Sequence, residues 1–261
     1  MTIERPVGGP HFRKPRGTAP RGTLQYEAAS LAWLGQVPDG APAVEVLSVD
    51  DDLLVEVDLP VAEPTTAMAE DFGRRLAHTH LAGAAGFGAA PDGWRGDGFL
   101  AGLPLPLLDP PQTSWGRFHA AARLRPVVRQ AVDQAVLAPA GAAAVEAVCQ
   151  RLEAGEFEDG RAADRIHGDL WAGNVVFTPD GGVLIDAAAH GGHGETDLAM
   201  LDLFGAPHLP RLRAAWAEVY QPASGWRERT ALHQLHPLLV HAVLFGGGYG
   251  HRAAELARRY A

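Results

Sequence analysis

Residues 166–174 read IHGDLWAGN, and residues 183–186 read VLID. These stretches place Asp169 and Asn174 five positions apart in a polar loop, and Asp186 twelve positions later at the end of an apolar run. Short β-type runs flank the loop, so the pattern predicts a strand, a loop and a second strand. Aspartate, asparagine and glycine also suit ordinary turns, so a structural turn is the alternative interpretation.

The three polar side chains are predicted to meet at one point. The turn PDGG (179–182) folds the chain back as a hairpin, which brings Asn174 and Asp186 alongside each other. Phosphoryl transfer needs a carboxylate beside the accepting hydroxyl and oxygen ligands for Mg²⁺, all on rigid backbone. Kinase catalytic loops carry an aspartate, an asparagine five positions on and a later metal-binding aspartate in this order. The sequence therefore predicts a kinase-type site with Asp169 as the base.

On the N-terminal side of this loop, the pattern predicts one helix and two strands. Residues 22–34 repeat apolar or small side chains at helical spacing, and a Pro-Asp-Gly turn follows them. The runs 43–49 and 53–59 are strand-like, and an acidic turn joins them. Residues 1–20 are expected to be irregular. A hinge is predicted at Pro60, where the strand pattern ends.

Beyond the hinge the pattern is mainly helical. Helical spacing starts at Thr65, and either Thr65 or Thr66 together with Glu70 resembles an N-terminal capping signal. Residues 83–112 are rich in glycine, proline and aspartate and are predicted to form a long ordered loop. The other predicted elements are helices at about 113–135, at 138–154 and from 196 to the end, and strands at 165–167, 175–177 and 183–185. We expect an α+β fold with a ligand cleft between two lobes.

The composition is typical of a globular protein. The chain has 261 residues and a net charge of −9 with dispersed basic residues, so we expect no nucleic-acid partner. Cys149 is the only cysteine, which excludes an intrachain disulfide and favours a reducing, cytoplasmic location. Residues 1–21 lack the apolar core of a signal peptide. The longest apolar stretch, 235–245, is too short to span a bilayer, so we expect no membrane partner.

Two long motifs resemble one known family. HGDLWAGN (167–174) and LIDAAAHGGHGETDLAM (184–200) are similar to sequences of the fructosamine kinase (ketosamine-3-kinase) family, as are LFG (203–205) and LHPLL (235–239). That family shares the protein-kinase-like fold of the aminoglycoside phosphotransferases. The resemblance implies a reduced N-terminal β-lobe, residues 1–61, that binds the nucleotide. It also implies a larger, mainly helical C-terminal lobe, residues 62–261, for catalysis and substrate binding.

The resemblance assigns roles within the catalytic loop. Asp169 would be the catalytic base, and Asn174 and Asp186 would bind Mg²⁺. The loop after Asp186 would line the substrate pocket through His190, His193 and Glu195, and Trp171 of the catalytic loop would line it as well. Trp171 has two equal interpretations, packing of the loop and stacking on a sugar ring.

The resemblance also assigns an ATP site to the N-terminal part of the chain. Lys14 would pair with the ATP phosphates, and Glu27 would hold that lysine in place. The backbone of Glu56, Val57 and Asp58 would meet the adenine as a hinge. Without the resemblance, Lys14 and Glu27 would be read as ordinary surface charges.

The sequence departs from the family pattern near its start and after Asp186. The family has a glycine-rich hairpin over the phosphates, whereas only thirteen residues precede Lys14 and Gly8-Gly9 lies too close to it for a full loop. Either the start lies late or this is a short variant with an open nucleotide site. Ala187 and Gly194 replace the usual proline and arginine of the family motif.

The histidines allow a second interpretation, a metal site formed by His190, His193 and Glu195. A Gly-Gly spacer without a cysteine partner disfavours zinc, and we expect a loop beside the substrate. Asp197 is expected to cap helix N–H groups and brace the catalytic loop. His167 is expected to anchor the loop backbone.

The sequence thus predicts an ATP- and Mg²⁺-dependent kinase that phosphorylates a sugar hydroxyl of ketosamines, in a repair-type deglycation of amines or proteins. Its substrate would be a small ketosamine or glycated amine, and the chain would be a monomer or a homodimer. One alternative is a phosphotransferase for aminoglycoside- or choline-type acceptors. The other is a non-catalytic pseudokinase, which the missing glycine-rich loop motivates.

Overall fold

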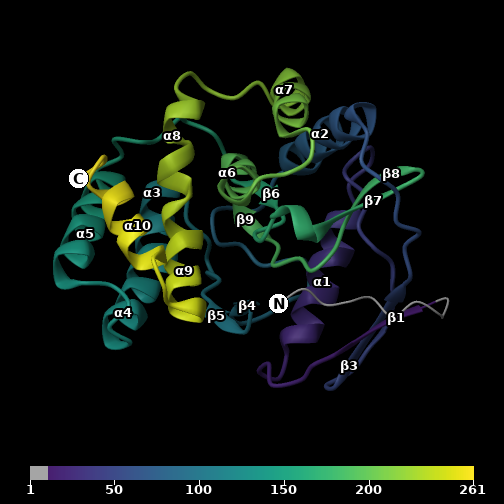
Figure 1. Ribbon diagram of the computed structural model, residues 1–261, viewed down its shortest axis with the longest axis horizontal. Helices are drawn as coiled ribbons and strands as arrows, with labels where there is room; N and C mark the ends of the chain where they lie inside the picture. Colours follow the sequence, from purple (N-terminus) through teal and green to yellow (C-terminus); the bar gives the residue numbers. More distant parts are fainter. Residues whose placement is uncertain (1–10) are drawn as a thin grey trace.

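A three-stranded antiparallel sheet forms one end of the computed structural model, which describes residues 11–261 (Figure 1). Its strands are β1 (His11–Pro15), β2 (Val46–Val49) and β3 (Leu53–Val57), in the order β1-β3-β2. Lys14 lies opposite Leu54 in the β1–β3 register. The prediction of an irregular segment 1–20 is therefore wrong for residues 11–15, and Gly8-Gly9 lies outside the described residues.

Helix α1 (Thr23–Gly35) connects this sheet to the rest of the molecule. It lies between the sheet and the larger part of the chain (Figure 1). The Tyr26 hydroxyl donates to the carbonyl oxygen of Ala189 over 2.8 Å, and the backbone N–H of Ala189 donates to Ser30 Oγ over 3.1 Å. Two hydrogen bonds thus join α1 to the segment that follows Asp186.

A β-hairpin of β7 (Val175–Thr178) and β8 (Gly181–Leu184) carries the predicted metal ligands at its open end. The chain segments just before β2 and just after β3 form backbone hydrogen bonds with this hairpin. The N–H of Val44 donates to the carbonyl of Leu184 over 2.9 Å, and the N–H of Ala62 donates to the carbonyl of Phe177 over 2.7 Å. The hairpin therefore lies where the two parts of the molecule join.

The larger part of the molecule is mainly helical, and the helices α4, α5 and α10 lie at the end opposite the sheet (Figure 1). Its helices are α2 (Thr66–Leu81), α3 (Trp115–Phe118), a π-helix (His119–Leu124), α4 (Arg125–Asp133), α5 (Pro139–Glu153), a 3₁₀ turn (Ala172–Asn174), α6 (Gly194–Phe204), α7 (Leu209–Tyr220), α8 (Trp226–His233), α9 (Leu235–Phe245) and α10 (Tyr249–Ala257). Two further strand pairs are β4 (Gly98–Leu100) with β5 (Leu103–Leu105), and β6 (Asp164–Ile166) with β9 (His190–Gly192).

Two apolar clusters hold the helical part together. One lies among α3 to α5 and α8 to α10 and contains Trp115 and Leu238. The other joins α1, α2, α6 and α7 to the β7–β8 hairpin through Phe72 and Trp216. The second cluster includes Leu170 of the catalytic loop together with Phe177 and Leu184 of the hairpin. Burial of apolar area in this cluster therefore also fixes the position of the catalytic loop.

The architecture agrees with the predicted α+β fold, a reduced β-lobe and a larger, mainly helical lobe, and differs in detail. The predicted loop 83–112 contains the short β4–β5 hairpin, and the predicted loop after Asp186 contains β9. The predicted boundary between residues 61 and 62 falls in the connection from β3 to α2, and it stays a prediction. Among residues 11–261, no helix combines the length and hydropathy needed to cross a bilayer.

Candidate active site

The catalytic loop lies between β6 and β7, and its geometry depends on Asn174. The Asn174 side-chain amide donates to the backbone oxygen of Asp169 over 2.8 Å and lies 3.3 Å from its Oδ2. Asn174 itself is 2% exposed, so it is held firmly by its surroundings. The five-residue spacing in the sequence therefore reflects a closed loop in which the asparagine fixes the aspartate.

Asp186 follows β8, where the hairpin brings it to the same end as Asn174. Val175 pairs with Leu184, and the N–H of Ile185 donates to the carbonyl of Asn174 over 3.1 Å. Asp186 has φ 55°, in the left-handed region that non-glycine residues seldom occupy. Such strain persists only where the surrounding structure imposes it, and it is concentrated at functional sites.

Lys14 joins the sheet and α1 to this end of the hairpin. Its Nζ lies 2.8 Å from Glu27 Oε1, 2.7 Å from Glu27 Oε2 and 3.0 Å from Asp186 Oδ1. Burial alone lowers the pKa of Lys14, but the charges of Glu27 and Asp186 more than offset this and raise the pKa above its ordinary value. The lysine therefore stays protonated, so the site presents a fixed positive charge.

Asp197 on α6 holds the backbone just before Asp169. Its Oδ2 accepts the N–H of His167 over 2.8 Å, and its Oδ1 accepts the N–H of Gly168 over 3.0 Å. His80 Nε2 lies 3.1 Å from Asp197 Oδ2. The predicted bracing of the catalytic loop is confirmed. The predicted helix cap is wrong, because the His193 ring accepts the N–H of Glu195 as the cap of α6.

His167 anchors the loop, as expected. Its Nε2 lies 2.9 Å from the carbonyl of Ile185, and the N–H of Asp169 donates to its Nδ1 over 3.2 Å. Gly168 has φ +82°, and a Cβ there would collide with the carbonyl of Ala188. Only glycine fits at this position, so the turn that aims Asp169 depends on the residue type as well as on the hydrogen bonds.

The environment of Asp169 favours a base that titrates near neutrality. Burial raises the pKa of Asp169 to about 7, and the charge of Asp186 adds to this rise. The hydrogen bond from Asn174 acts in the opposite direction. A general base is most effective when its pKa lies near the operating pH.

Asp169 faces a cavity of about 320 Å³, which we call the acceptor pocket. Its walls come from the β4–β5 turn, the catalytic loop, α6, α9 and α10. The lining residues are Leu100, Ala101, Gly168, Asp169, Trp171, Thr196, Asp197, Met200, Phe204, His236, Pro237, Val240, His241, Leu244, Phe245 and Tyr249. Sequence reasoning missed the α9 and α10 wall. Its only signal was the LHPLL motif (235–239), which was noted for its family resemblance.

Trp171 both packs the loop and lines the pocket. Its ring covers Gly173, where a Cβ would collide with it, and the side chain is 41% exposed. The sequence left open whether Trp171 packs the loop or stacks on a sugar ring. The two roles are compatible, because the ring covers Gly173 and also borders the pocket.

His190, His193 and Glu195 do not line the acceptor pocket, although the sequence predicted that they would. His190 lies on β9, 4% exposed, with its Nδ1 2.9 Å from the carbonyl of Ala188. His193 and Glu195 are 3% and 2% exposed. β9 pairs with β6, and the motif is buried instead of facing the pocket.

His193, Glu195 and His233 bring possible metal-ligand atoms within 4.8 Å of one another. Protein partners already occupy the candidate atoms of His193 and Glu195, and His233 Nε2 lies 3.3 Å from Glu195 Oε2. His193 Nε2 lies 3.1 Å from Asp159 Oδ2, and Arg229 Nη2 donates to Glu195 Oε1 over 2.5 Å. A guanidinium beside the carboxylate opposes a second cation, so the group is a buried ion network that ties α6 to α8.

Glu56, Val57 and Asp58 lie at the end of β3. Glu56 is opposite Phe12 and Val57 is opposite His11 in the β1–β3 register. The N–H of Val57 donates to the carbonyl of Glu45 over 3.0 Å. Their place at the exit of the central strand is compatible with the predicted adenine hinge, which stays a prediction.

The donor set at the open end of the hairpin suits Mg²⁺. Asn174 offers an amide oxygen and Asp186 a carboxylate, and the Asp186 side chain is 31% exposed beside the fixed charge of Lys14. Mg²⁺ prefers oxygen ligands, takes one or two carboxylates and completes its shell with water and phosphate oxygens. The residues therefore fit the predicted ion.

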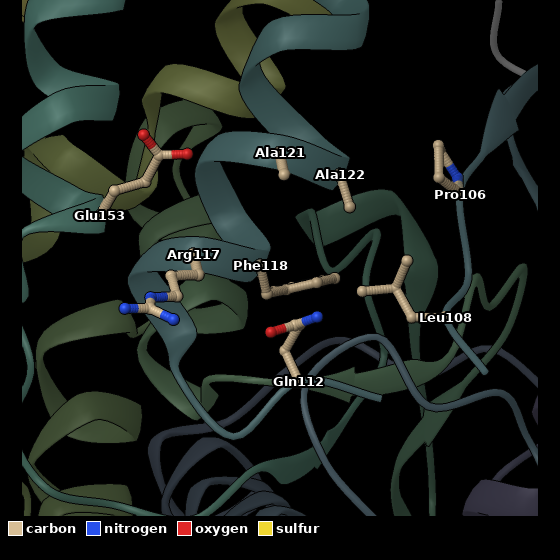
Figure 2. Close-up of a pocket in the computed structure, with 8 residues that line it drawn as sticks. All are labelled: Pro106, Leu108, Gln112, Arg117, Phe118, Ala121, Ala122 and Glu153. Atoms are coloured by element: carbon tan, nitrogen blue, oxygen red, sulfur yellow. The ribbon is translucent and has the colours of Figure 1, made fainter. Parts of the chain in front are cut away.

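A larger hollow of about 520 Å³ lies beside the π-helix and contains none of the predicted site residues (Figure 2). Figure 2 shows Arg117 and Glu153 on one side and Pro106 and Leu108 on the other, with the Phe118 ring between them. Glu153 forms an ion pair with Arg125, in which Glu153 Oε1 lies 2.5 Å from Arg125 Nη1. The full lining is Pro106, Leu108, Gln112, Arg117, Phe118, Ala121, Ala122 and Glu153. Because Asp169 and Trp171 line the acceptor pocket, that pocket is the better candidate for the active site.

Comparison with known proteins agrees with the motif resemblance. The family model described as fructosamine kinase matches residues 15–260. A protein from Thermobifida fusca, assigned as a fructosamine-3-kinase, has a solved structure that is 44% identical in sequence. It matches with a TM-score of 0.88 over 97% of this chain and 86% of that chain.

A protein of Synechocystis sp. named probable ketoamine kinase is 35% identical over 192 residues, which are 72% of this chain and 60% of that protein. The match therefore spans less than two thirds of the length of that relative. An aminoglycoside phosphotransferase with ADP bound is only 10% identical, but matches with a TM-score of 0.61 over 95% of this chain and 86% of that chain. This last likeness shows that the fold is protein-kinase-like.

Proposed function

Because the chain belongs to the fructosamine kinase family, we propose that it uses ATP to phosphorylate a sugar hydroxyl of a ketosamine, the adduct of a sugar and an amine. One observation supports this most strongly. Asp169 lines the acceptor pocket while Asn174 holds it, and the Lys14–Glu27–Asp186 group lies at the neighbouring end of the hairpin. A base, two oxygen ligands and a fixed cation are the parts that phosphoryl transfer requires.

Asp169 would accept a hydrogen bond from the acceptor hydroxyl and aim its oxygen at the γ-phosphorus. The proton would pass to the Asp169 carboxylate as the new O–P bond forms. Because Asn174 and the His167 ring fix the loop, the carboxylate needs little reorganisation at that moment.

Asn174 and Asp186 would hold Mg²⁺, which screens the charge of the donor phosphates when it is bound. Lys14 would donate to phosphate oxygens beside Asp186, with Glu27 keeping its ammonium in place. The backbone at Glu56 to Asp58 would contact the adenine. The ADP bound to the related aminoglycoside phosphotransferase supports a nucleotide donor.

The proposed division of labour places the nucleotide on residues 1–61 and the acceptor on residues 62–261. Phosphorylation of a ketosamine would serve the removal of sugar adducts from amines or proteins. An aminoglycoside acceptor gains no support from the pocket, because Asp169 and Asp197 are the only acidic residues that line it in the described part of the chain. Such acceptors carry several positive charges that need acidic partners.

The decisive variant is Asp169→Asn, assayed for ADP formation with a fructosyl-amine, ATP and Mg²⁺. Loss of the base should lower kcat by about 10²- to 10⁴-fold. The melting temperature should not fall, because the change removes a buried charge. The exposed Asp133→Asn is the matched control and should keep full activity.

Retained turnover in Asp169→Asn would refute the assignment of the base. If the unaltered protein transfers phosphate to no ketosamine, to no aminoglycoside and to no choline-type acceptor, the non-catalytic alternative replaces the proposal.

A further inference from the structure

The acceptor pocket has one carboxylate available to a ligand. Asp197, the other acidic residue of the lining, already accepts two backbone N–H groups and lies 3.1 Å from His80 Nε2. Asp169 faces the reacting hydroxyl. Among the residues 11–261 that the structure describes, no lysine and no arginine line the pocket. The amine substituent of a bound ketosamine, which lies away from the sugar, would therefore meet no free acidic or basic side chain among these lining residues.

One part of the pocket wall is apolar and aromatic. It is formed by Phe204, Leu244, Phe245 and Tyr249, from α6, α9 and α10, around the ring of His241, and we call it the aromatic wall. The His241 ring centroid lies 4.6 Å from that of Phe204, 5.4 Å from that of Phe245 and 5.3 Å from that of Tyr249. The wall thus forms one continuous surface.

Two features fix and expose this wall. His241 Nδ1 lies 2.8 Å from the carbonyl of Pro237, so the ring is held in orientation by its own helix. Phe245 is 62% exposed at the end of α9, although it is a large apolar side chain. Exposed aromatic side chains that continue into a pocket are typical of ligand contacts.

The size of the pocket restricts its occupant. A volume of about 320 Å³ is near the lower limit of small-molecule sites. It accommodates one sugar with a compact substituent, whereas a folded protein surface would contact only its mouth.

From these observations we propose that the aromatic wall binds an apolar, preferably aromatic, substituent on the amine of the ketosamine. The preferred acceptor would be the sugar adduct of a small aromatic amine, with the sugar hydroxyl at Asp169 and the ring against Phe245 and Tyr249. Adducts of the lysine side chain, whose substituent ends in charged groups, would bind more weakly. This inference rests on the proposed function and assigns its substrate class.

The test compares two acceptors that differ only in a phenyl ring, the fructose adducts of phenethylamine and of ethylamine. Their Kd values are measured by calorimetry with and without Mg²⁺ and a non-hydrolysable ATP analogue, so that binding is separated from transfer. The phenethylamine adduct should bind about 10- to 100-fold more tightly, the range expected for burial of one aromatic ring. Fructosyl-lysine should resemble the ethylamine adduct.

Phe245→Ser should reduce the ratio of the two Kd values toward one, since it removes an exposed ring. Val132→Ser, which changes an exposed apolar side chain on α4 away from the pocket, should keep the ratio of the unaltered protein. Equal Kd values in the unaltered protein, no binding of either adduct, or a ratio unchanged by Phe245→Ser would each overturn the inference. Selective binding without phosphate transfer would overturn only the proposed function.

Discussion

Lys14 lies between two carboxylates at the junction of the two lobes. Removal of the Glu27 charge leaves Lys14 its ion pair with Asp186, so the ammonium is expected to move toward that predicted metal ligand. We expect Glu27→Gln to raise the KM for ATP about tenfold, because a hydrogen bond between charged groups contributes about 1.5–3 kcal/mol. Steady-state kinetics at saturating ketosamine measure this.

The conservative variant Glu27→Asp should recover part of the affinity for ATP. The exposed Glu45→Gln, a matched change on the same lobe, should leave the KM unaltered. An unchanged KM in Glu27→Gln would show that Lys14 needs no second residue to hold it.

At the scale of single residues, the sequence predicted the local parts of the site better than the distant ones. The spacing of Asp169, Asn174 and Asp186 lies within one loop and one hairpin, so the chain itself predicts their meeting. Lys14 and Glu27 come together across a strand and a helix, and only the family resemblance suggested the pair. The wrong pocket assignment of His190 has a tertiary cause, the pairing of β9 with β6.

At the scale of elements, the contact between α2 and α7 depends on a glycine. A Cβ at Gly73 would collide with the carbonyl of Leu212 and lie 3.2 Å from the backbone nitrogen of Trp216. We expect Gly73→Ala to lower the free energy of unfolding by about 1–3 kcal/mol, because the two helices must separate. Urea denaturation followed by circular dichroism measures the loss.

Gly248→Ala is the matched control, because φ at Gly248 is −83° and no atom lies within 4 Å of the added Cβ. It should unfold at the same urea concentration as the unaltered protein, or slightly higher. Equal stability of both variants would mean that α2 and α7 tolerate a wider spacing.

Elements with strong periodicity were predicted, as were the short strands β6, β7 and β8, whereas β1, β4, β5 and β9 were missed. The predicted helices 22–34 and 138–154 correspond to α1 and α5 within one or two residues at each end. The strand β9 reads His-Gly-Gly, which has no β propensity and forms through its partner β6. The helix predicted at 113–135 contains the π-helix at 119–124, which repeats no pattern visible in the sequence.

At the scale of the whole molecule, buried histidines make stability depend on pH. Burial lowers the pKa of His190 to about 3 and of His233 to about 4. Burial also lowers the pKa of His119, His167 and His236. Below pH 6.5 the unfolded chain takes up protons that the folded chain does not bind, so the free energy of unfolding falls as pH falls. Each such histidine contributes a slope of about 1.4 kcal/mol per pH unit.

Melting temperatures should therefore decrease from pH 7 to pH 5, before most carboxylates titrate. His190→Asn should have a shallower slope than the unaltered protein, and the exposed His251→Asn should keep the original slope. His193 opposes the trend, because Asp159 raises its pKa against the effect of burial. A melting temperature that stays constant over this range would contradict the neutral state assigned to the buried histidines.

The division into a smaller α/β part and a larger, mainly helical part followed from the residue pattern, whereas the protein-kinase-like fold followed from the family resemblance. The aromatic wall could not be predicted from the sequence, since α9 and α10 meet the catalytic loop only in the folded chain. Their apolar residues have the same pattern as core residues, so the sequence cannot distinguish a wall that faces solvent from one that faces the interior.

Trp171 makes the tryptophan fluorescence of the protein sensitive to the acceptor pocket. Of the six tryptophans in the chain, it alone is among the exposed large apolar side chains, at 41%, whereas Trp94 is half-buried and Trp33, Trp115, Trp216 and Trp226 are buried. A water-soluble quencher such as acrylamide would thus reach mainly the indole beside Asp169. Any ligand seated there would shield that indole and shift its emission, so fluorescence of the unlabelled protein can report occupancy directly, without coupling enzymes or radioactive nucleotide.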